Sequence, residues 1–251
     1  MLVMGILNVT PDSFADGGRH NEFAAAVAHG LEMIAEGVDI IDIGGESTRP
    51  GADRVTEEEE IARVIPVITE LAKHGIPISI DTMRASTAEA AINAGASIIN
   101  DVSGGLADPD MLQTAARLQV TYIAMHWRGQ SKDMNSKAIY ADVVSDVISE
   151  LNERIDSAID AGIHKDKLII DPGIGFAKDA DHNWAIIDSI DRFVAMGYPV
   201  LVGASRKRFL GGDSPDEREQ ATIELTKRLG TTGVWAVRVH SVKPHKEVLC
   251  S

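Results

Sequence analysis

Polar side chains end a series of short apolar runs along the chain. The runs cover residues 2–7, 38–43, 76–80, 97–99, 120–125, 168–170, 200–202 and 234–239. The residues that follow or end them include Asn8, Asp42, Asp81, Asn100, His126, Asp171, Lys207, Arg238 and His240. A single Asp or Asn in such a place usually forms a turn or a helix cap. Polar groups at every strand end, converging on one rim, instead predict a binding or catalytic site.

Three of the segments after these runs carry more chemistry than a turn requires. Residues 8–18 combine Pro11, two glycines, two carboxylates and Phe14, which predicts a lid that places Phe14 against a ligand. Residues 44–51 contain glycines that permit close backbone approach, and Arg49 can fork onto an anion. Arg206, Lys207 and Arg208 form a cationic run where we expect a helix to begin. Positive charge is unfavourable at a helix N-terminus, so this run predicts an anionic ligand.

Helical patterns fill the gaps between the apolar runs. They cover residues 23–35, 57–73, 85–94, 138–161 and 180–196, and a Gly follows several of them, as is common after helices. Eight repeats of strand and helix predict an α/β fold, a (β/α)8 TIM barrel that forms a single domain over residues 1–251. The alternative is an open doubly wound sheet. That fold usually has a glycine-rich turn after its first strand, whereas here the residues are Leu7-Asn8-Val9-Thr10.

Composition and missing motifs exclude several kinds of function. The 251 residues carry a net charge of −14, which argues against nucleic acid as the main partner. No apolar run is long enough to span a membrane, and the lone Cys250 suits a reducing compartment, so we expect a cytoplasmic protein. The chain has no P-loop and no HExxH motif, and residues 203–207 fail the pattern of a serine nucleophile elbow. We expect His126 to be hydrogen-bonded rather than to bind a metal.

Eight segments in a fixed order resemble one enzyme family. They are residues 4–14, 44–51, 79–82, 100–102, 125–126, 171–176, 205–207 and 238–240. In these segments the chain closely resembles bacterial dihydropteroate synthases, and residues 125–128 and 203–209 are most similar to actinobacterial members. The resemblance implies a TIM-type barrel that condenses 6-hydroxymethyl-7,8-dihydropterin pyrophosphate with p-aminobenzoate, giving 7,8-dihydropteroate and pyrophosphate. It also implies assistance by Mg2+, a cytoplasmic homodimer and inhibition by sulfonamides.

The resemblance also assigns roles to individual residues. It implies a pterin site of carboxylate, amide, aromatic and ammonium groups, formed by Asp81, Asn100, Asp171, Phe176 and Lys207. Anion-binding groups would hold the diphosphate, namely Asn8, Thr48, Arg238 and His240, with Asn8 also binding Mg2+. The p-aminobenzoate pocket would consist of Phe14, Thr48, Arg49, Pro50 and Arg208. Catalysis would rest on Lys207, Asp171 and Asp16, whose carboxylate could stabilise positive charge on the pterin methylene if the C–O bond breaks first.

The chain departs from the family pattern near its end. Ser241 follows His240 where the family usually has Asp, and only ten residues come after it, so we expect a truncated last helix. The helix expected at 220–229, in the region of the family's dimer interface, is more polar than usual. Two rival functions follow. A methyltetrahydrofolate methyltransferase would share the pterin-facing residues but needs no diphosphate site. A silent paralogue would only bind pterin, although the segments at 8–18 and 44–51 are intact.

Overall fold

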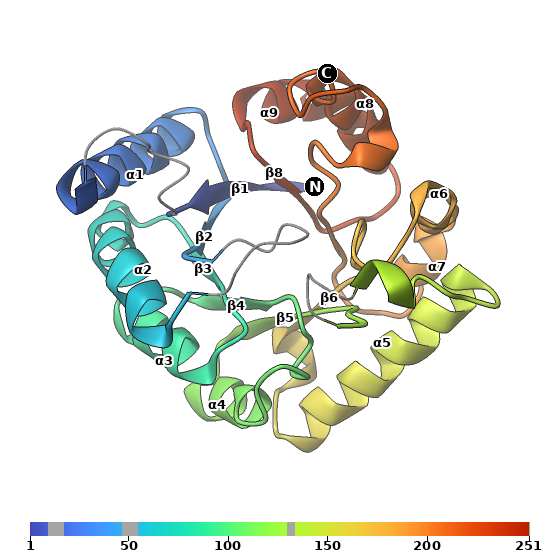
Figure 1. The fold of residues 1–251 in the computed structure, drawn as a ribbon, viewed down its shortest axis with the longest axis horizontal. Helices are drawn as coiled ribbons and strands as arrows, with labels where there is room; N and C mark the ends of the chain where they lie inside the picture. The colour runs from blue at the N-terminus through green and yellow to red at the C-terminus, as the bar shows by residue number, and fades with distance from the viewer. Residues whose placement is uncertain (10–17, 47–54, 130–133, 251) are drawn as a thin grey trace.

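Eight parallel strands form a sheet that closes on itself (Figure 1). The computed structural model describes residues 1–9, 18–46, 55–129 and 134–250. The strands are β1 (Leu2–Asn8), β2 (Ile40–Gly44), β3 (Ile78–Asp81), β4 (Ile98–Asp101), β5 (Thr121–Met125), β6 (Leu168–Asp171), β7 (Leu201–Val202) and β8 (Ala236–Val239). Their order is β6-β5-β4-β3-β2-β1-β8-β7, and a bridge between Ile170 and Val200 joins the two ends. The predicted (β/α)8 barrel is confirmed.

Helices surround the strands in Figure 1. They are α1 (Gly18–Ala35), α2 (Glu57–Leu71), α3 (Ala85–Asn93), α4 (Met111–Leu118), α5 (Val143–Asp160), α6 (Ala180–Asp188), α7 (Ile190–Val194), α8 (Glu219–Leu229) and α9 (Lys243–Leu249). Their apolar faces pack on the outward-facing strand residues, as Val64, Ile68 and Leu71 of α2 do in the same buried cluster as Ile41 and Ile43 of β2. No helix within the described ranges is long and apolar enough to cross a membrane.

Local interactions explain where the helices begin and end. Thr56 caps α2 by accepting from the Glu59 amide at 3.2 Å, and four glutamates follow in the first turn, where the helix dipole favours them. The helix predicted from residue 138 begins instead at Val143, because Asp142 accepts from the Ser145 amide at 2.7 Å and caps it there. The helix predicted over 180–196 is two helices, because Ser189 leaves the helical conformation between α6 and α7.

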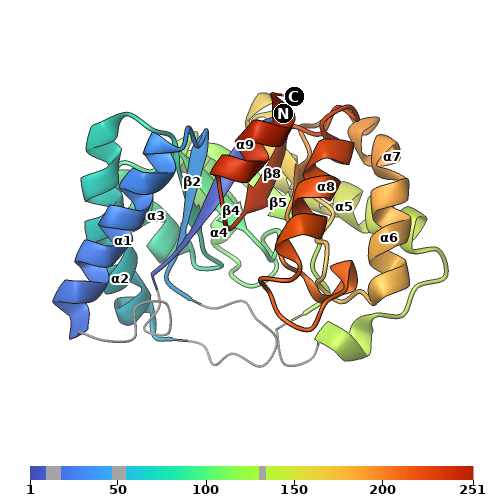
Figure 2. The ribbon, with the colours of Figure 1, turned by 90° about the horizontal axis from the view of Figure 1, so that it is seen from above.

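The barrel interior is closed by apolar side chains at the end where the strands begin. These side chains form a cluster that we call the floor, consisting of Met4, Ile40, Ile98, Ile123, Ile169, Leu201 and Ala236. Both ends of the chain lie at this same end of the barrel, as Figure 2 shows. Because side chains alternate along a strand, the residues two positions beyond the floor also point into the barrel. The open end of the barrel is therefore where inward-facing polar groups collect.

Candidate active site

The inward-facing residues just above the floor are mostly polar. Each belongs to a different strand, so the closed sheet brings together side chains that are far apart in the sequence. We call this set the polar layer, and it consists of Asp42, Asp81, Asn100, Asp171 and Arg238. The three aspartates and the asparagine are buried. A buried layer with so many acceptors fits a ligand that presents several N–H donors.

Arg238 joins the carboxylates of two neighbouring strands. Its Nε donates to Asp42 Oδ2 at 2.6 Å, and its Nη2 donates to Asp81 Oδ2 at 2.6 Å. Asn100 Nδ2 donates to the same Asp42 oxygen at 3.1 Å, while Asp42 Oδ1 is buried without a hydrogen-bond partner. Charge-assisted bonds of this kind fix the guanidinium plane. One side of the polar layer is therefore a rigid network in which a cation sits between two acids.

Asp81 holds its proton unusually tightly. Burial raises its pKa from 3.8 to about 7; Arg238 opposes the rise, while the nearby Asp42, Glu60 and Asp101 add to it. A carboxyl with this pKa is divided between its acid and carboxylate forms near neutral pH. It can therefore change protonation state when a ligand offers it a hydrogen-bond donor.

The other side of the polar layer is formed by Asp171 and Lys207. Asp171 Oδ1 accepts from the Gly173 amide at 2.7 Å, and burial raises the pKa of this carboxyl. Burial also lowers the pKa of Lys207 to about 8, although Asp171 counteracts this. Lys207 Nζ lies 4.5 Å from the centre of the Phe176 ring and donates to the Ile174 carbonyl. An acceptor, an ammonium and an aromatic face thus meet at one place, as a flat heteroaromatic ring requires.

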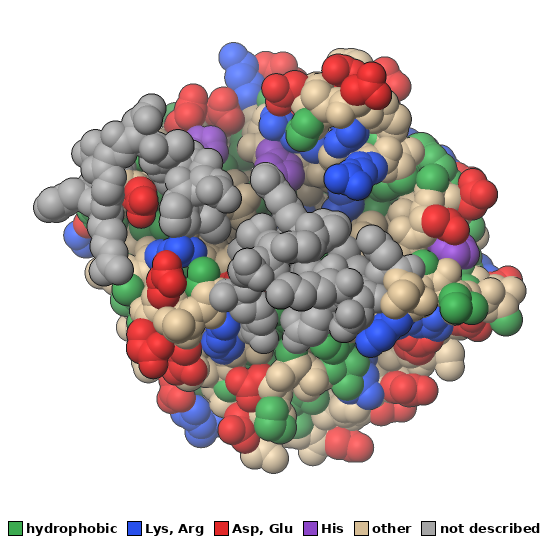
Figure 3. All heavy atoms as spheres, viewed as in Figure 1, with side chains coloured by type: hydrophobic (Ala, Val, Ile, Leu, Met, Phe, Trp, Pro, Cys, Tyr) green, Lys and Arg blue, Asp and Glu red, His purple; other side chains and the backbone are tan. Residues whose placement is uncertain are grey.

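The remaining described residues of the predicted site lie near the rim. His240 follows β8, and its Nδ1 and amide both contact Ser205 Oγ, at 2.9 and 3.2 Å. Asn8 ends β1 beside Gly44 of β2. Arg208 is exposed to solvent. On this face of the molecule, basic and histidine side chains gather over the α8 and α9 side of the barrel, as Figure 3 shows.

The expectation that the cationic run begins a helix is wrong. Arg208–Leu210 form a single 3-10 turn, and the following Gly211 and Gly212 have left-handed φ angles of 86° and 73°. The helix begins only at Glu219. The charge of Arg206 is balanced by an acidic partner, since its Nε donates to Glu219 Oε2 at 2.6 Å. The helix-dipole argument for an anion at this run therefore does not apply.

The unusual Ser241 contacts a carboxylate supplied from elsewhere in the chain. Its hydroxyl donates to Glu219 Oε1 on α8, and the same carboxylate binds Arg206. An acidic group thus lies beside the position where the family usually has Asp, although it comes from a different element. The departure at this position removes an acidic side chain from the segment without removing the negative charge from its surroundings.

Five predicted site residues, Phe14, Asp16, Thr48, Arg49 and Pro50, lie outside the described residues. Two groups in the same region were absent from the predicted site. Asp42 ends a predicted strand, but its bond to Arg238, 196 positions away, has no local signature in the sequence. Lys178 is buried near Asp171, in the short segment between Phe176 and the start of α6. No residue next to it in the sequence indicates that it is buried.

Known proteins share both the sequence and this architecture. The family model described as pterin binding enzyme matches residues 4–240. A dihydropteroate synthase of Mycobacterium leprae is 48% identical over 257 residues, covering 98% of this chain and 90% of that protein. The expected likeness to actinobacterial sequences agrees with this relative.

Solved structures give the same result. The dihydropteroate synthase of Xanthomonas albilineans with 4-aminobenzoic acid has a TM-score of 0.93 and 44% identity, covering 99% of this chain and 90% of that one. The same enzyme with 7,8-dihydropteroate has a TM-score of 0.90 and 41% identity, covering 99% and 91%. The Yersinia pestis enzyme in complex with a sulfonamide drug has a TM-score of 0.93 and 39% identity, covering 99% and 92%.

Proposed function

The chain belongs to the pterin binding enzymes, and within them to the dihydropteroate synthases, and from this membership we propose how its residues carry out the reaction. The reaction joins 6-hydroxymethyl-7,8-dihydropterin pyrophosphate to p-aminobenzoate and yields 7,8-dihydropteroate and pyrophosphate. The observation that carries the assignment of roles is the polar layer, where buried acceptors face one another across the barrel. The roles follow from the chemistry of each ligand group.

Pterin recognition rests on complementary hydrogen bonds. The ring offers N3–H and a 2-amino group as donors, and Asp81, Asn100 and Asp171 are the buried acceptors. Lys207 donates to the O4 and N5 edge, and Phe176 lies along the ring, next to that ammonium. A ligand lacking these donors would leave buried carboxylates unsatisfied, which is costly and therefore discriminating.

Diphosphate binding is assigned to Asn8, Thr48, Arg238 and His240. Arg238 and His240 are two positions apart on one strand end, so they face the same side. Nη1 is the guanidinium nitrogen of Arg238 that its bonds to Asp42 and Asp81 do not use. The guanidinium is thus oriented by its two acids before the anion arrives, which lowers the entropy lost on binding.

The donor atoms near the rim fit a magnesium ion that arrives with the diphosphate. No three His, Cys, Asp or Glu side chains gather to hold a metal among the residues that the structure describes. Asn8 offers an amide oxygen, and Mg2+ prefers oxygen ligands and keeps several waters while binding phosphates. We assign Asn8 as the protein ligand. When bound, the ion would neutralise charge on the leaving diphosphate.

The chemical step needs no protein nucleophile. The C–O bond between the pterin methylene and the diphosphate breaks, and the electron pair leaves with the diphosphate. The amine of p-aminobenzoate then attacks the methylene carbon and loses a proton. The Asp16 carboxylate would stabilise positive charge on the methylene, while Asp171 and Lys207 hold the ring in place. Phe14, Thr48, Arg49, Pro50 and Arg208 would form the p-aminobenzoate pocket, which a sulfonamide would also enter.

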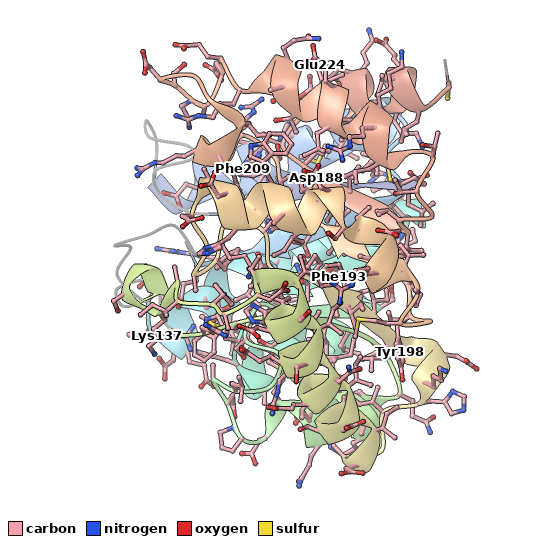
Figure 4. All side chains as sticks on the ribbon, turned by 90° about the vertical axis from the view of Figure 1, so that its right-hand side faces the viewer. Lys137, Asp188, Phe193, Tyr198, Phe209 and Glu224 are labelled. Atoms are coloured by element: carbon pink, nitrogen blue, oxygen red, sulfur yellow. The ribbon has the colours of Figure 1, made fainter. Side chains whose placement is uncertain are left out.

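Assembly and location complete the proposal. We assign a homodimer formed through the face of α6, α7 and α8. There Trp184 of α6, 36% exposed, meets Phe209 edge-on with ring centres 5.3 Å apart. Figure 4 shows Phe209 between α6 and the segment leading into α8. The lone Cys250 suits the reducing cytoplasm. Light scattering at micromolar concentration should give twice the monomer mass of 26.9 kDa.

The decisive experiment follows both products in one reaction. Purified protein is given the pterin pyrophosphate, p-aminobenzoate and Mg2+, and pyrophosphate release and dihydropteroate are measured together. We expect equal amounts of both, dependent on each substrate. Pterin binding without turnover would identify a silent paralogue. Pyrophosphate release without dihydropteroate, or transfer of a methyl group from methyltetrahydrofolate, would contradict the assignment.

A further inference from the structure

A buried lysine lies directly behind the pterin-facing side of the polar layer. Lys178 is 8% exposed, and its Nζ contacts the Gly173 carbonyl at 3.0 Å, the Phe176 carbonyl at 3.0 Å and His126 Nδ1 at 2.9 Å. None of these contacts involves a reacting group of the proposed mechanism. The three contacts use every N–H of an ammonium, so the charged form of Lys178 is fully satisfied in this position.

The segment that Lys178 binds has an irregular backbone. Gly173, Gly175 and Ala177 all have left-handed φ angles, of 69°, 79° and 49°. Within residues 172–177 the Phe176 amide donates to the Gly173 carbonyl at 3.1 Å, and side chains provide further donors to the carbonyls of this irregular segment. Besides the two bonds to Lys178, the Ile174 carbonyl accepts from Lys207 and the Ala177 carbonyl accepts from Tyr140 at 3.0 Å.

Two functional side chains depend on the shape of this segment. Asp171 precedes it and accepts from the Gly173 amide, while Phe176 is part of it. The position of a Cβ on Gly173 would be only 2.4 Å from the His126 carbonyl, so the backbone is packed closely against the end of β5. A change in the carbonyl directions of Gly173 and Phe176 would therefore move the acceptor and the aromatic ring that face the pterin.

A chain of hydrogen bonds links Lys178 to residues at the protein surface. Arg128 donates to Glu150 on α5, and the Glu150 carboxylate lies 3.0 Å from His126 Nε2. Burial lowers the pKa of His126 to about 4, so the ring is neutral at pH 7. Its Nε2 then carries the proton toward Glu150, and its Nδ1 accepts from Lys178. Glu150 thus fixes the tautomer that Lys178 requires.

We propose that Lys178 is a positioning residue, which holds residues 172–177 in the shape that presents Asp171 and Phe176 to the pterin, and that Glu150 acts on it through His126. This inference rests on the proposed function, because it assumes that the ligand is a pterin. If a fraction f of molecules has the correct shape, the apparent dissociation constant rises by 1/f. Loss of Lys178 should therefore change pterin affinity, whereas kcat at saturation should change little.

The proposal also fixes the direction of a pH effect. Burial lowers the pKa of Lys178 to about 7; Asp171 and Glu150 act to raise it, and Lys207 and Arg128 act to lower it. Above this pH the neutral amine has only two N–H donors for three acceptors. Pterin affinity should therefore contain a component that falls as pH rises through about 7. Asp81 contributes a rise over the same range and Lys207 a later change near 8, so the Lys178 component is read as the difference between wild type and Lys178→Met.

The test measures affinity without turnover. The dissociation constant of 6-hydroxymethyl-7,8-dihydropterin, which has no phosphate, is measured by calorimetry from pH 6 to 8.5. At pH 6, Lys178→Met should weaken binding about tenfold, the result of reducing f to about one tenth, and it should lose the component near pH 7. The kcat should stay within about threefold of the wild type, and the KM for p-aminobenzoate within about twofold, since neither depends on f once the pterin is bound. Lys167→Met, which changes an exposed lysine just before β6, should behave like the wild type.

A second variant covers the case in which Lys178→Met does not fold. Glu150 is 34% exposed, so Glu150→Gln should fold, and removing its charge should move the component near pH 7 to lower pH. Wild-type affinity in folded Lys178→Met, or an unmoved pH profile in Glu150→Gln, would overturn the proposal. Failure of the wild type to bind the dihydropterin would instead overturn the proposed function, so the two failures are distinguishable.

Discussion

Pterin binding should release a proton from Asp81. With a pKa of about 7, this carboxyl is protonated in about nine tenths of molecules at pH 6, half at pH 7 and one tenth at pH 8. Only the carboxylate can accept from both N3–H and the 2-amino group, so the bound state lowers the pKa of Asp81. The release attributable to Asp81 should therefore be about 0.9, 0.5 and 0.1 proton per ligand at these three pH values.

Calorimetry in buffers of low and high ionisation enthalpy measures this release directly. The probe is the dephosphorylated dihydropterin, because a diphosphate would titrate in the same range. Lys178 and Lys207 favour proton uptake, so the quantity to read is the difference between wild type and Asp81→Asn. The exposed Asp110→Asn should match the wild type. A difference near zero at pH 7, or one that grows toward pH 8, would refute the raised pKa or the contact with the ring.

Three further predictions concern other parts of the molecule. His240→Ala should weaken binding of the pterin pyrophosphate but not of the dephosphorylated alcohol in calorimetry, and equal loss for both would remove the diphosphate role. Asp16→Asn should lower kcat by roughly ten- to a thousandfold with little change in the KM for pterin, whereas full activity would make Asp16 a turn residue. Tyr122→Phe should reduce the free energy of unfolding by about 1–3 kcal/mol in urea, because its hydroxyl donates to buried Asp101 at 2.7 Å. An unchanged free energy of unfolding would show that the hydroxyl of Tyr122 adds nothing to stability, and would contradict this prediction.

The fold could be predicted because apolar strand-like runs alternate with helical patterns along the sequence, and only a few architectures have this alternation. Buried parallel strands appear as short Ile, Val and Leu runs, and the polar residues after them collect at one end of the barrel. Helix boundaries were less predictable. Where α5 begins depends on the cap at Asp142, and the break at Ser189 follows no proline or glycine.

The sequence predicts which strand ends form the site, but not which side chains hydrogen-bond to one another there. Asn100 and Asp101 are adjacent and polar, yet only Asn100 faces the polar layer. Asp101 instead accepts from the Ser103 and Gly105 amides, at 2.8 and 2.7 Å, in the following turn. Deciding between them requires the phase of the side-chain alternation, which a four-residue strand such as β4 defines poorly.

The apolar floor makes the barrel open at one end only. Met4, Leu201 and Ala236 are fully buried, so apolar side chains close the barrel between the strand starts. In the proposed arrangement the pterin ring lies next to this floor and the arylamine lies nearer the mouth. A molecule already seated at the mouth would obstruct the deeper one, whatever its own affinity. The proposed arrangement therefore predicts that the pterin pyrophosphate enters first and p-aminobenzoate follows. It also predicts that both products leave through the same mouth.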